Sequence, residues 1–317
     1  MKITILDNAT LGADISTEQI KVFGEIEYFD VTKPEETKGR IANSEIVITN
    51  KVVIGENELN AAKSLKLICV AATGTNNIDF EAAAKHHVAV TNVKGYSTES
   101  VAQTVISYML IFSSSTRKFS DFSLSGKWQK SPIFTNLDFP FFELKGKTLG
   151  IIGYGSIAKR VEELAQAFGM KILIAESLQK KEKLQNRTAL PELLKSSDFV
   201  SVHTPLTPKT KNLISREELQ MMKPTAFIIN TARGGIINES DLRKALDNKS
   251  IAGAGVDVLS EEPPQNGNPL LVARNIILTP HIAWTSGESR ARLIQGITNN
   301  IQTYVDGNIA SIDLCKK

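Results

Sequence analysis

The sequence predicts an α/β protein with two domains, each built on a doubly wound parallel sheet. The chain has 317 residues, whereas a single core usually stops growing at about 250–300 residues, so two domains are expected. Short runs rich in Val and Ile alternate with helical patterns along the first third of the chain, and the alternation starts again at Lys147. Such alternation is typical of parallel strands covered by helices.

The first series contains predicted strands that are short apolar runs bounded by polar or Gly-containing turns. They cover residues 3–6, 45–49, 65–72 and 88–93, and a helix is expected over residues 79–86. A longer helical pattern begins near Thr98, where apolar residues recur at three- and four-residue spacing. Residues 120–142 carry Gly126, Pro132, Pro140 and many aromatic residues without a clean period. We interpret this segment as an irregular arm.

The second series repeats the alternation of strands and helices. Its predicted strands cover residues 148–152, 171–175, 199–203, 226–230, 254–258 and 276–279. Helices are expected near residues 157–168, 215–222 and 239–247, and a last long helix is expected over residues 287–304. The two series together predict two Rossmann-like domains.

Composition excludes several classes of protein. The net charge is only +3 without a long Lys/Arg block, which disfavours nucleic acid as the main partner. Cys69 and Cys315 are far apart and form neither a disulfide framework nor a zinc pattern, so no metal is expected. The N-terminus turns acidic at Asp7, and no apolar run approaches the roughly 20 residues that span a bilayer. We therefore expect a cytoplasmic protein without a membrane partner.

The strongest local motif is a strand that runs into Gly153-Tyr154-Gly155-Ser156-Ile157-Ala158 and then opens a helix. Gly153 permits the tight turn, Gly155 leaves room for a pyrophosphate, and Ala158 allows the helix to pack closely on the strand. The helix N-terminus offers free N–H groups to the anion. The motif predicts a dinucleotide site.

Glu176 strengthens this prediction because it ends the next strand, about 20 residues on, where an acidic ribose ligand belongs. A carboxylate there holds the 2′-hydroxyl and repels a 2′-phosphate, so the cofactor is predicted to be NAD rather than NADP. The alternative is an ordinary Gly-rich turn with Glu176 as a surface acid. Strand, turn, helix and acid in this order disfavour it.

Polar residues follow three predicted strands of the second series, namely Arg233, Glu262 and His281. Ligands of open parallel sheets lie beyond the carboxyl ends of the strands. These residue types suit reversible hydride transfer at a 2-keto acid: Arg233 binds the anion, His281 donates the proton, and a carboxylate orients the imidazole. Singly, each has a structural interpretation as a turn, core or loop residue, and Glu261 is a neighbouring candidate for the carboxylate.

With further motifs added, the chain resembles the D-isomer-specific 2-hydroxyacid dehydrogenases over nearly its whole length. The resemblance runs through residues 74–79, 96–102, 153–158, 203–207, 230–235, 257–264 and 280–284. Departures are few: Ala158 stands where the family often has a third glycine, and Glu176 stands where Asp is more common.

The resemblance implies a domain division. Residues 1–98 plus 285–317 would form a flavodoxin-like substrate-binding domain, and residues 99–284 would form an NAD-binding Rossmann domain. Hinges would lie near residues 96–100 and 282–287, with an active-site cleft between the domains. Members of the family are usually homodimers joined through the nucleotide domain, and the arm would belong to that contact.

The resemblance also implies site residues. Arg233, Glu262 and His281 would be catalytic, with Glu262 rather than Glu261 in the position before proline. The cofactor would contact Gly153, Tyr154, Gly155, Ser156, Ile157, Glu176, His203, Thr204, Pro205, Thr231, Ala232, Arg233, Asp257 and His281. The substrate would contact Ala72, Thr73, Gly74, Arg233, His281 and Trp284.

Within the family, residues 71–77 and 281–284 look most like glycerate dehydrogenases, which reduce hydroxypyruvate. Glyoxylate, pyruvate and phosphoglycerate are alternative substrates. A formate dehydrogenase is disfavoured because such enzymes pair their His with Gln rather than Glu. An NADH-sensing protein similar to some corepressors is a further alternative, although a sensor has no chemical need for the intact trio.

Overall fold

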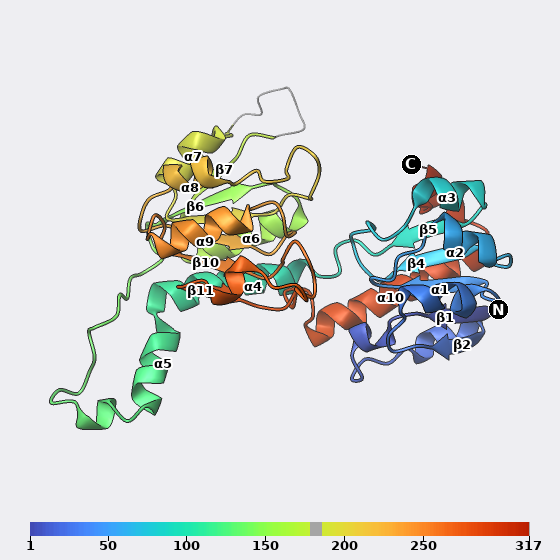
Figure 1. Ribbon diagram of the computed structural model, residues 1–317, viewed down its shortest axis with the longest axis horizontal. Coiled ribbons are helices and arrows are strands. Elements are labelled where there is room, and N and C mark those ends of the chain that lie inside the picture. Colours follow the sequence, from blue (N-terminus) through green and yellow to red (C-terminus); the bar gives the residue numbers. More distant parts are fainter. Residues whose placement is uncertain (178–185, 317) are drawn as a thin grey trace. The chain divides into compact units, whose positions relative to one another are not determined.

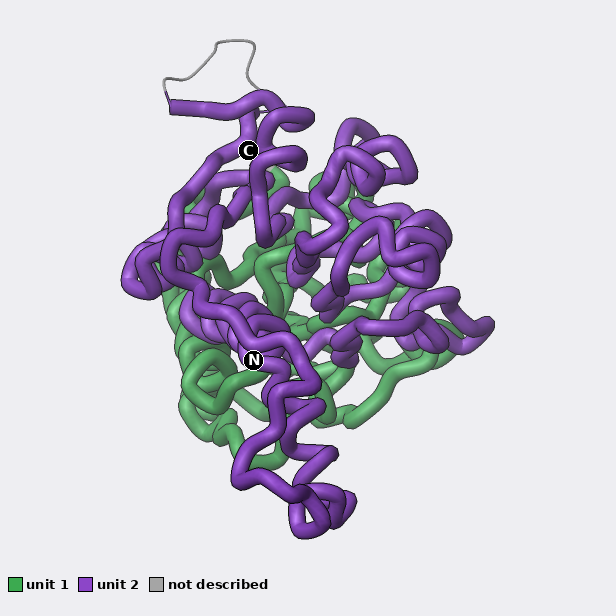
Figure 2. Tube along the Cα trace, turned by 90° about the vertical axis from the view of Figure 1, so that its left-hand side faces the viewer, with its two compact units in different colours: residues 1–97, 285–317 green, residues 98–284 purple. Residues whose placement is uncertain are grey.

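The computed structural model describes residues 1–177 and 186–316, which form two compact units (Figures 1 and 2). Unit 1 comprises Met1–Ser97 and Thr285–Lys317, and unit 2 comprises Thr98–Trp284. Each unit contains one parallel sheet, five-stranded in unit 1 and six-stranded in unit 2 over the described residues. The predicted fold class, two α/β domains on parallel sheets, is confirmed.

The sheet of unit 1 has the strand order β2-β1-β3-β4-β5, with every pair parallel. Its strands are β1 (Lys2–Ile5), β2 (Glu25–Tyr28), β3 (Ile46–Thr49), β4 (Leu67–Val70) and β5 (Ala89–Asn92). β3 and β4 are buried along their whole length. Their continuous apolar sequences follow from helices covering both faces of the sheet.

β2 is an edge strand that periodicity did not predict. Its sequence, Glu-Ile-Glu-Tyr, is mostly exposed and pairs with β1 alone. Charged side chains on an edge strand hinder pairing with another chain, but they also remove the apolar signal of a strand. Pairing with β1, rather than composition, makes this segment a strand.

Unit 1 contains helices from both ends of the chain. Its α-helices are α1 (Pro34–Ile41), α2 (Glu56–Ala61), α3 (Phe80–Lys85) and α10 (Gly287–Val305), and its 3₁₀ helices are Asn8–Leu11, Glu18–Phe23, Ile309–Ser311 and Leu314–Lys316. The Ser286 hydroxyl caps α10 by accepting from the Ser289 N–H. Leu293, Ile297 and Ile301 on one face of α10 are fully buried, so the C-terminal helix is part of the core of unit 1.

The sheet of unit 2 has the order β11-β10-β9-β8-β6-β7, again all parallel. Its strands are β6 (Thr148–Ile152), β7 (Lys171–Ile174), β8 (Phe199–Val202), β9 (Phe227–Asn230), β10 (Gly253–Val256) and β11 (Ile276–Leu278). Each predicted strand of the second series matches one of these within two residues. Apolar clusters cover both faces of the sheet.

The helices of unit 2 complete its layers. They are α4 (Thr98–Ser114), α5 (Thr116–Leu124), α6 (Ser156–Ala167), α7 (Leu190–Ser196), α8 (Arg216–Met221) and α9 (Glu239–Asp247), with 3₁₀ helices at Trp128–Lys130 and Pro269–Val272. α4 packs against α6, where Val105 and Met109 meet Val161 and Ala165 in one buried cluster. Among the described helices of both units, none is long and apolar enough to cross a membrane.

The prediction of an irregular arm over residues 120–142 is wrong for its first part. Residues up to Leu124 belong to α5, which is separated from α4 by Ser115 in a left-handed conformation with φ 49°. α5 buries none of its residues, and Phe119 and Phe122 contact only Phe139 among the aromatic rings of the described chain. Figure 1 shows α5 and the residues after it extending away from the strands of unit 2. The Gly and Pro residues that follow α5 are typical of irregular structure, and they masked this helix in the sequence.

Candidate active site

The candidate residues of unit 2 lie at one edge of its sheet. Because all six described strands are parallel, their carboxyl ends share that edge. The strand order reverses direction at β6, and such a switch point is where ligands of open α/β sheets bind. From one end of the edge to the other, the strands are followed by Glu176 (β7), Gly153 (β6), His203 (β8), Arg233 (β9), Asp257 (β10) and His281 (β11).

The turn between β6 and α6 is shaped for an anion. Gly153 has φ 87°, and a Cβ there would lie 2.6 Å from the carbonyl oxygen of His203. A Cβ on Gly155 would instead meet nothing within 4 Å, so space is open above this residue. Gly155 is the N-cap of α6, without a side-chain cap and without an acidic residue in the first turn. The N–H groups of Ser156 and Ile157 therefore begin the helix with its partial positive charge uncompensated.

Tyr154 lies within this turn, and Glu176 follows the neighbouring strand β7. The Glu176 backbone N–H donates to the Thr188 carbonyl at 3.0 Å, which fixes the residue at the end of β7. The guanidinium of Arg187 lies 4.5 Å from the centre of the Tyr154 ring and also reaches the Ala175 carbonyl. The Tyr154 hydroxyl bonds the Glu162 carboxylate. This end of the edge combines an acid with a stacked cation.

His203 lies beside the turn and is half-buried. Burial lowers the pKa of its imidazole to about 4, and its Nε2 is 2.8 Å from the Ser201 Oγ. The imidazole is therefore neutral at neutral pH. Thr204 is half-buried and Pro205 is exposed immediately after it.

His281 and Glu262 form a direct pair. The His281 Nδ1 lies 2.6 Å from the Glu262 Oε2, and the other Glu262 oxygen accepts from the Leu259 N–H at 2.8 Å. Since a carboxylate only accepts, Nδ1 carries the proton of this bond. Nε2 of His281 bonds no residue in the part of the chain that the structure describes, so this nitrogen is available to a ligand. Glu261 contacts Asn266 instead.

Asp257 is the buried anchor of the loop that carries His281. Its side chain is 1% exposed, and one carboxylate oxygen accepts from Thr279 Oγ1 and from the Ile282 N–H while the other accepts from the Ala283 N–H. Burial raises the pKa of Asp257, and these donors oppose the rise. His281, with φ 54°, also donates its backbone N–H to the Asp257 carbonyl.

Arg233 follows β9 in a turn braced by Asn230. The amide of Asn230 accepts from the Ala232 N–H and donates to the Arg233 carbonyl. One guanidinium N–H of Arg233 donates to the Ala232 carbonyl, and the others donate to no residue within ranges 1–177 and 186–316. A half-buried cation with unused donors is suited to an anionic ligand. Beside it, the Thr231 Oγ1 is the buried side-chain polar atom without a partner among the described residues.

The candidate substrate residues Ala72, Thr73 and Gly74 lie in unit 1, in the loop after β4. Thr73 is held at both ends: its hydroxyl donates to the Val93 carbonyl, and its carbonyl accepts from the Asn92 side chain. The backbone N–H groups of Thr73 and Gly74 donate to no group in the described chain, so they remain available to a ligand. Trp284 is half-buried at the end of unit 2.

Comparison with known proteins identifies the family. Residues 106–283 match the model of the D-isomer specific 2-hydroxyacid dehydrogenase NAD binding domain. The chain is 37% identical to a glycerate dehydrogenase from Methylorubrum extorquens over 309 residues, which cover 96% of each chain. The chain belongs to the D-isomer specific 2-hydroxyacid dehydrogenases.

Two further comparisons extend over the whole dehydrogenase. It is 36% identical to a hydroxypyruvate reductase from Blautia hydrogenotrophica over 320 residues, which cover 98% of this chain and 99% of the relative. The structure of D-lactate dehydrogenase from Aquifex aeolicus, solved with NAD and lactic acid, has a TM-score of 0.82 at 26% identity and covers 98% of this chain and 97% of that chain. The predicted family, enzyme class and NAD cofactor are thereby confirmed.

The candidate site of this dehydrogenase also contains residues that sequence analysis did not find. Tyr108 and Thr279 connect to Asp257 by hydrogen bonds, and Arg187 stacks on Tyr154. Tyr108 belongs to the helix predicted to begin near Thr98, where the periodicity indicates only an apolar face. No local pattern links a helix to a strand end about 170 residues later. Within the described residues, no group of three His, Cys, Asp or Glu side chains could hold a metal ion.

Proposed function

We propose that this dehydrogenase reduces hydroxypyruvate to D-glycerate with NADH. The observation that carries the chemistry is the His281–Glu262 pair, with a separation of 2.6 Å, on the same sheet edge as Arg233. The similarity to a glycerate dehydrogenase and a hydroxypyruvate reductase over nearly the whole chain supports the choice of substrate.

The residues of unit 2 fit NAD. The uncapped N-terminus of α6 and the open space above Gly155 suit the pyrophosphate. The unpartnered Thr231 hydroxyl and the Asp257 carboxylate suit the carboxamide of nicotinamide. We assign cofactor contacts to Gly153, Tyr154, Gly155, Ser156, Ile157, Glu176, His203, Thr204, Pro205, Thr231, Ala232, Arg233, Asp257 and His281. When bound, NADH supplies the hydride.

Glu176 selects NAD over NADP in this proposal. Its position at the end of β7 suits a hydrogen bond to the 2′-hydroxyl of the adenosine ribose, and its charge repels a 2′-phosphate. Arg187, stacked on Tyr154, lies on the same side of the turn. A preference for NAD over NADP therefore requires that Glu176 repels the 2′-phosphate more strongly than Arg187 attracts it.

His281 acts as the general acid of the reduction. Glu262 binds Nδ1–H and thereby directs Nε2 toward the reacting carbonyl, which gains negative charge as it is reduced. Nε2–H of the protonated imidazole then donates its proton to that oxygen, and the neutral imidazole that remains keeps its Nδ1–H on Glu262. In the oxidation of the hydroxy acid, Nε2 takes the hydroxyl proton.

Arg233 and the loop of unit 1 bind the substrate anion. The unused guanidinium N–H groups suit the planar carboxylate and the keto oxygen together. The free N–H groups of Thr73 and Gly74 offer further donors. We assign substrate contacts to Ala72, Thr73, Gly74, Arg233, His281 and Trp284. Residues 1–98 with 285–317 are accordingly proposed as the substrate-binding domain, and residues 99–284 as the NAD-binding domain.

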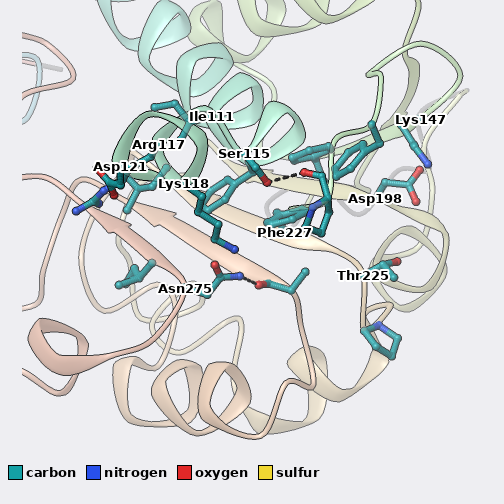
Figure 3. A pocket seen from close by; sticks show the side chains of 18 residues that line it. Ile111, Ser115, Arg117, Lys118, Asp121, Lys147, Asp198, Thr225, Phe227 and Asn275 are labelled. Carbon is teal, nitrogen blue, oxygen red and sulfur yellow. Dashed lines mark hydrogen bonds between the residues drawn. The ribbon is translucent and has the colours of Figure 1, made fainter. Parts of the chain in front are cut away.

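We further propose that the enzyme is a cytoplasmic homodimer joined through the arm, residues 120–142. Six large apolar side chains of the arm are at least half exposed: Leu124, Trp128, Ile133, Phe134, Leu137 and Phe141. Such a concentration of apolar surface is typical of an interface. At the root of the arm, the Ser115 hydroxyl donates to the Pro140 carbonyl. A cavity of about 670 Å³ lies beside it, lined by Lys118 and Asp121 of α5, by Phe227 of β9 and by Asn275, which precedes β11 (Figure 3). Its lining carries both signs of charge, which suits a self-complementary contact.

A substrate panel tests the proposed function. NADH oxidation is followed with hydroxypyruvate, glyoxylate, pyruvate, phosphohydroxypyruvate and 2-oxoglutarate, and each assay is repeated with NADPH. The highest kcat/KM is expected for hydroxypyruvate with NADH. A higher value for glyoxylate or pyruvate would overturn the choice of substrate but not the reaction class. NADH binding without turnover of any keto acid would instead indicate the sensor alternative.

A further inference from the structure

Tyr108 reaches the candidate site from the interior of unit 2. The residue lies on the buried face of α4 and is 3% exposed. Its hydroxyl hydrogen-bonds Thr279 Oγ1, and Thr279 Oγ1 lies 2.5 Å from Asp257 Oδ1. Side chains from α4, from the end of β11 and from the end of β10 therefore form one continuous hydrogen-bonded chain, which we call the Tyr108 relay. Tyr108 and Asp257 are buried and Thr279 is half-buried.

The relay has a fixed direction. A carboxylate only accepts hydrogen bonds, so the single hydroxyl proton of Thr279 is donated to Asp257. The Tyr108 hydroxyl must then donate to Thr279 Oγ1. Burial raises the pKa of Tyr108 to about 12, so this proton stays on the phenol across the working range of the enzyme. Aligned donors polarise one another, so the phenol strengthens the Thr279 bond to Asp257.

Asp257 connects the relay to the loop that carries His281. Its carboxylate accepts from the Ile282 and Ala283 N–H groups at 2.8 Å, and its carbonyl accepts from the His281 N–H. His281 has φ 54°, a conformation that non-glycine residues adopt only when the surroundings hold it. The hydrogen bonds to Asp257 supply that restraint.

The phenol ring is itself held in place. A Cβ on Gly255, two residues before Asp257, would lie 2.6 Å from the Tyr108 Cδ2. The ring thus occupies the space over the glycine and packs directly on β10. Since both the ring and α4 are anchored, the hydroxyl presents its proton to Thr279 from a rigid support.

We propose that Tyr108 is a positioning residue that orients the Asp257 carboxylate, and through it the His281 loop, by way of Thr279. This role rests on the functions proposed above for Asp257 and His281. The titratable groups that face Asp257 are Tyr108 from α4 and His281 from the adjoining loop. Removal of the phenol hydroxyl is therefore expected to disturb both NADH binding and turnover without creating a cavity in the core.

Tyr108→Phe tests the proposal because it keeps the ring over Gly255 and removes only the hydroxyl. Loss of one buried hydrogen bond predicts a fall in kcat of about three- to tenfold, with the KM for the keto acid nearly unchanged. A weaker Thr279 donor also destabilises ionised Asp257. The pH below which NADH binding is lost, followed by quenching of protein fluorescence, is therefore expected to move upward.

Two further variants separate positioning from stability. Ser197→Ala removes a fully buried hydroxyl elsewhere in unit 2, where it donates only to the Leu193 carbonyl. It is expected to lower the unfolding midpoint while leaving kcat and the pH profile unchanged. Thr279→Ser keeps the relay hydroxyl and is expected to retain the wild-type pH profile, whereas Thr279→Val is expected to shift it as Tyr108→Phe does.

The outcomes are decisive in either direction. A wild-type kcat and NADH-binding profile in Tyr108→Phe would overturn the proposal, as would losses no larger than those of Ser197→Ala. The binding profile needs no turnover, so it tests the relay even if the wild-type enzyme reduces none of the keto acids and the proposed function fails.

Discussion

Glu262 Oε2 lies 2.6 Å from His281 Nδ1, whereas the carboxylate of the adjacent Glu261 turns to Asn266. Two neighbouring acids in one loop thus have different partners. Glu262 is also bonded to the Leu259 N–H, which holds its second oxygen and leaves the first in line with the imidazole. The pair therefore has a defined orientation before any substrate binds.

Glu262→Gln is expected to lower kcat by about 10- to 100-fold, because a charge-assisted hydrogen bond is replaced by a neutral one. NADH affinity is expected to change little, since Glu262 is not among the proposed cofactor contacts. Steady-state kinetics together with NADH titration measure both. Glu261→Gln is the matched control and should keep wild-type kcat. Equal losses in the two variants would contradict the assignment.

Arg233→Lys keeps the positive charge and removes the planar fork. We expect kcat/KM for the keto acid to fall by about 100-fold or more, because two parallel hydrogen bonds to the carboxylate are lost. Arg243→Lys, at a surface pair with Asp247, serves as the control. A variant of Arg233 that retains wild-type kcat/KM would show that the anion is bound elsewhere.

Glu176→Ala is expected to weaken NADH binding by about 10- to 100-fold, the value of a hydrogen bond to a charged group, and to leave NADPH binding equal or tighter. Dissociation constants for both cofactors measure the change in preference. Glu192→Ala, an exposed acid in the first turn of α7, controls for the loss of surface charge. An unchanged ratio of the two constants would remove Glu176 from the ribose site.

His203 makes folding stability depend on pH. Its pKa is lowered from 6.5 to about 4 by burial, so between these values the unfolded chain binds a proton that the folded chain does not. The contribution of neutral His203 to the free energy of unfolding is therefore fully present above pH 6.5. It falls as the pH drops toward 4, by at most about 1.4 kcal/mol per pH unit. Urea unfolding across this range is expected to show a shallower dependence in His203→Gln. His87→Asn, at an exposed histidine, should leave the slope unchanged.

Charged substitutions in the arm test the proposed dimer. Phe134 and Leu137 are 89% and 82% exposed, so Asp at either position costs little in an isolated chain and much in an apolar interface. We expect Phe134→Asp with Leu137→Asp to convert a dimer into monomers by light scattering. Leu271→Asp, an exposed apolar residue of unit 2 outside the arm, should remain dimeric. A monomeric wild-type enzyme would contradict the proposal directly.

Local patterns were sufficient for much of this enzyme. The β6–α6 turn is predictable because Gly153, Gly155 and Ala158 lie within one short segment. Their small size permits the tight turn, the open space above it and the close packing of the helix on the strand. Arg233, Glu262 and His281 are predictable as neighbours because they follow parallel strands, whose carboxyl ends share one edge of the sheet. In both cases strand periodicity and the rule for parallel sheets are sufficient to predict where these residues lie.

Other features arise from pairing and packing between distant segments. β2 is a strand only because β1 offers it a partner, and its charged sequence gives no apolar alternation. α5 buries none of its residues, and Gly126, Pro132 and Pro140 follow it closely, so the composition of this stretch indicates irregular structure rather than a helix. The choice of Glu262 over Glu261 follows from the backbone path of one loop, which turns adjacent side chains to different partners.

The sequence by itself determined the two α/β domains, the family and the residues that carry the proposed chemistry, because these depend on periodicity, short motifs and the order of strands. Only the tertiary structure decided which groups contact one another: the Glu262 oxygen on His281, the unpartnered Thr231 hydroxyl, and the Tyr108 relay to Asp257. Such hydrogen bonds form only when donor and acceptor atoms lie about 3 Å apart in a suitable direction. The residues that carry these atoms are up to 171 positions apart in the chain. No local pattern in the chain encodes them.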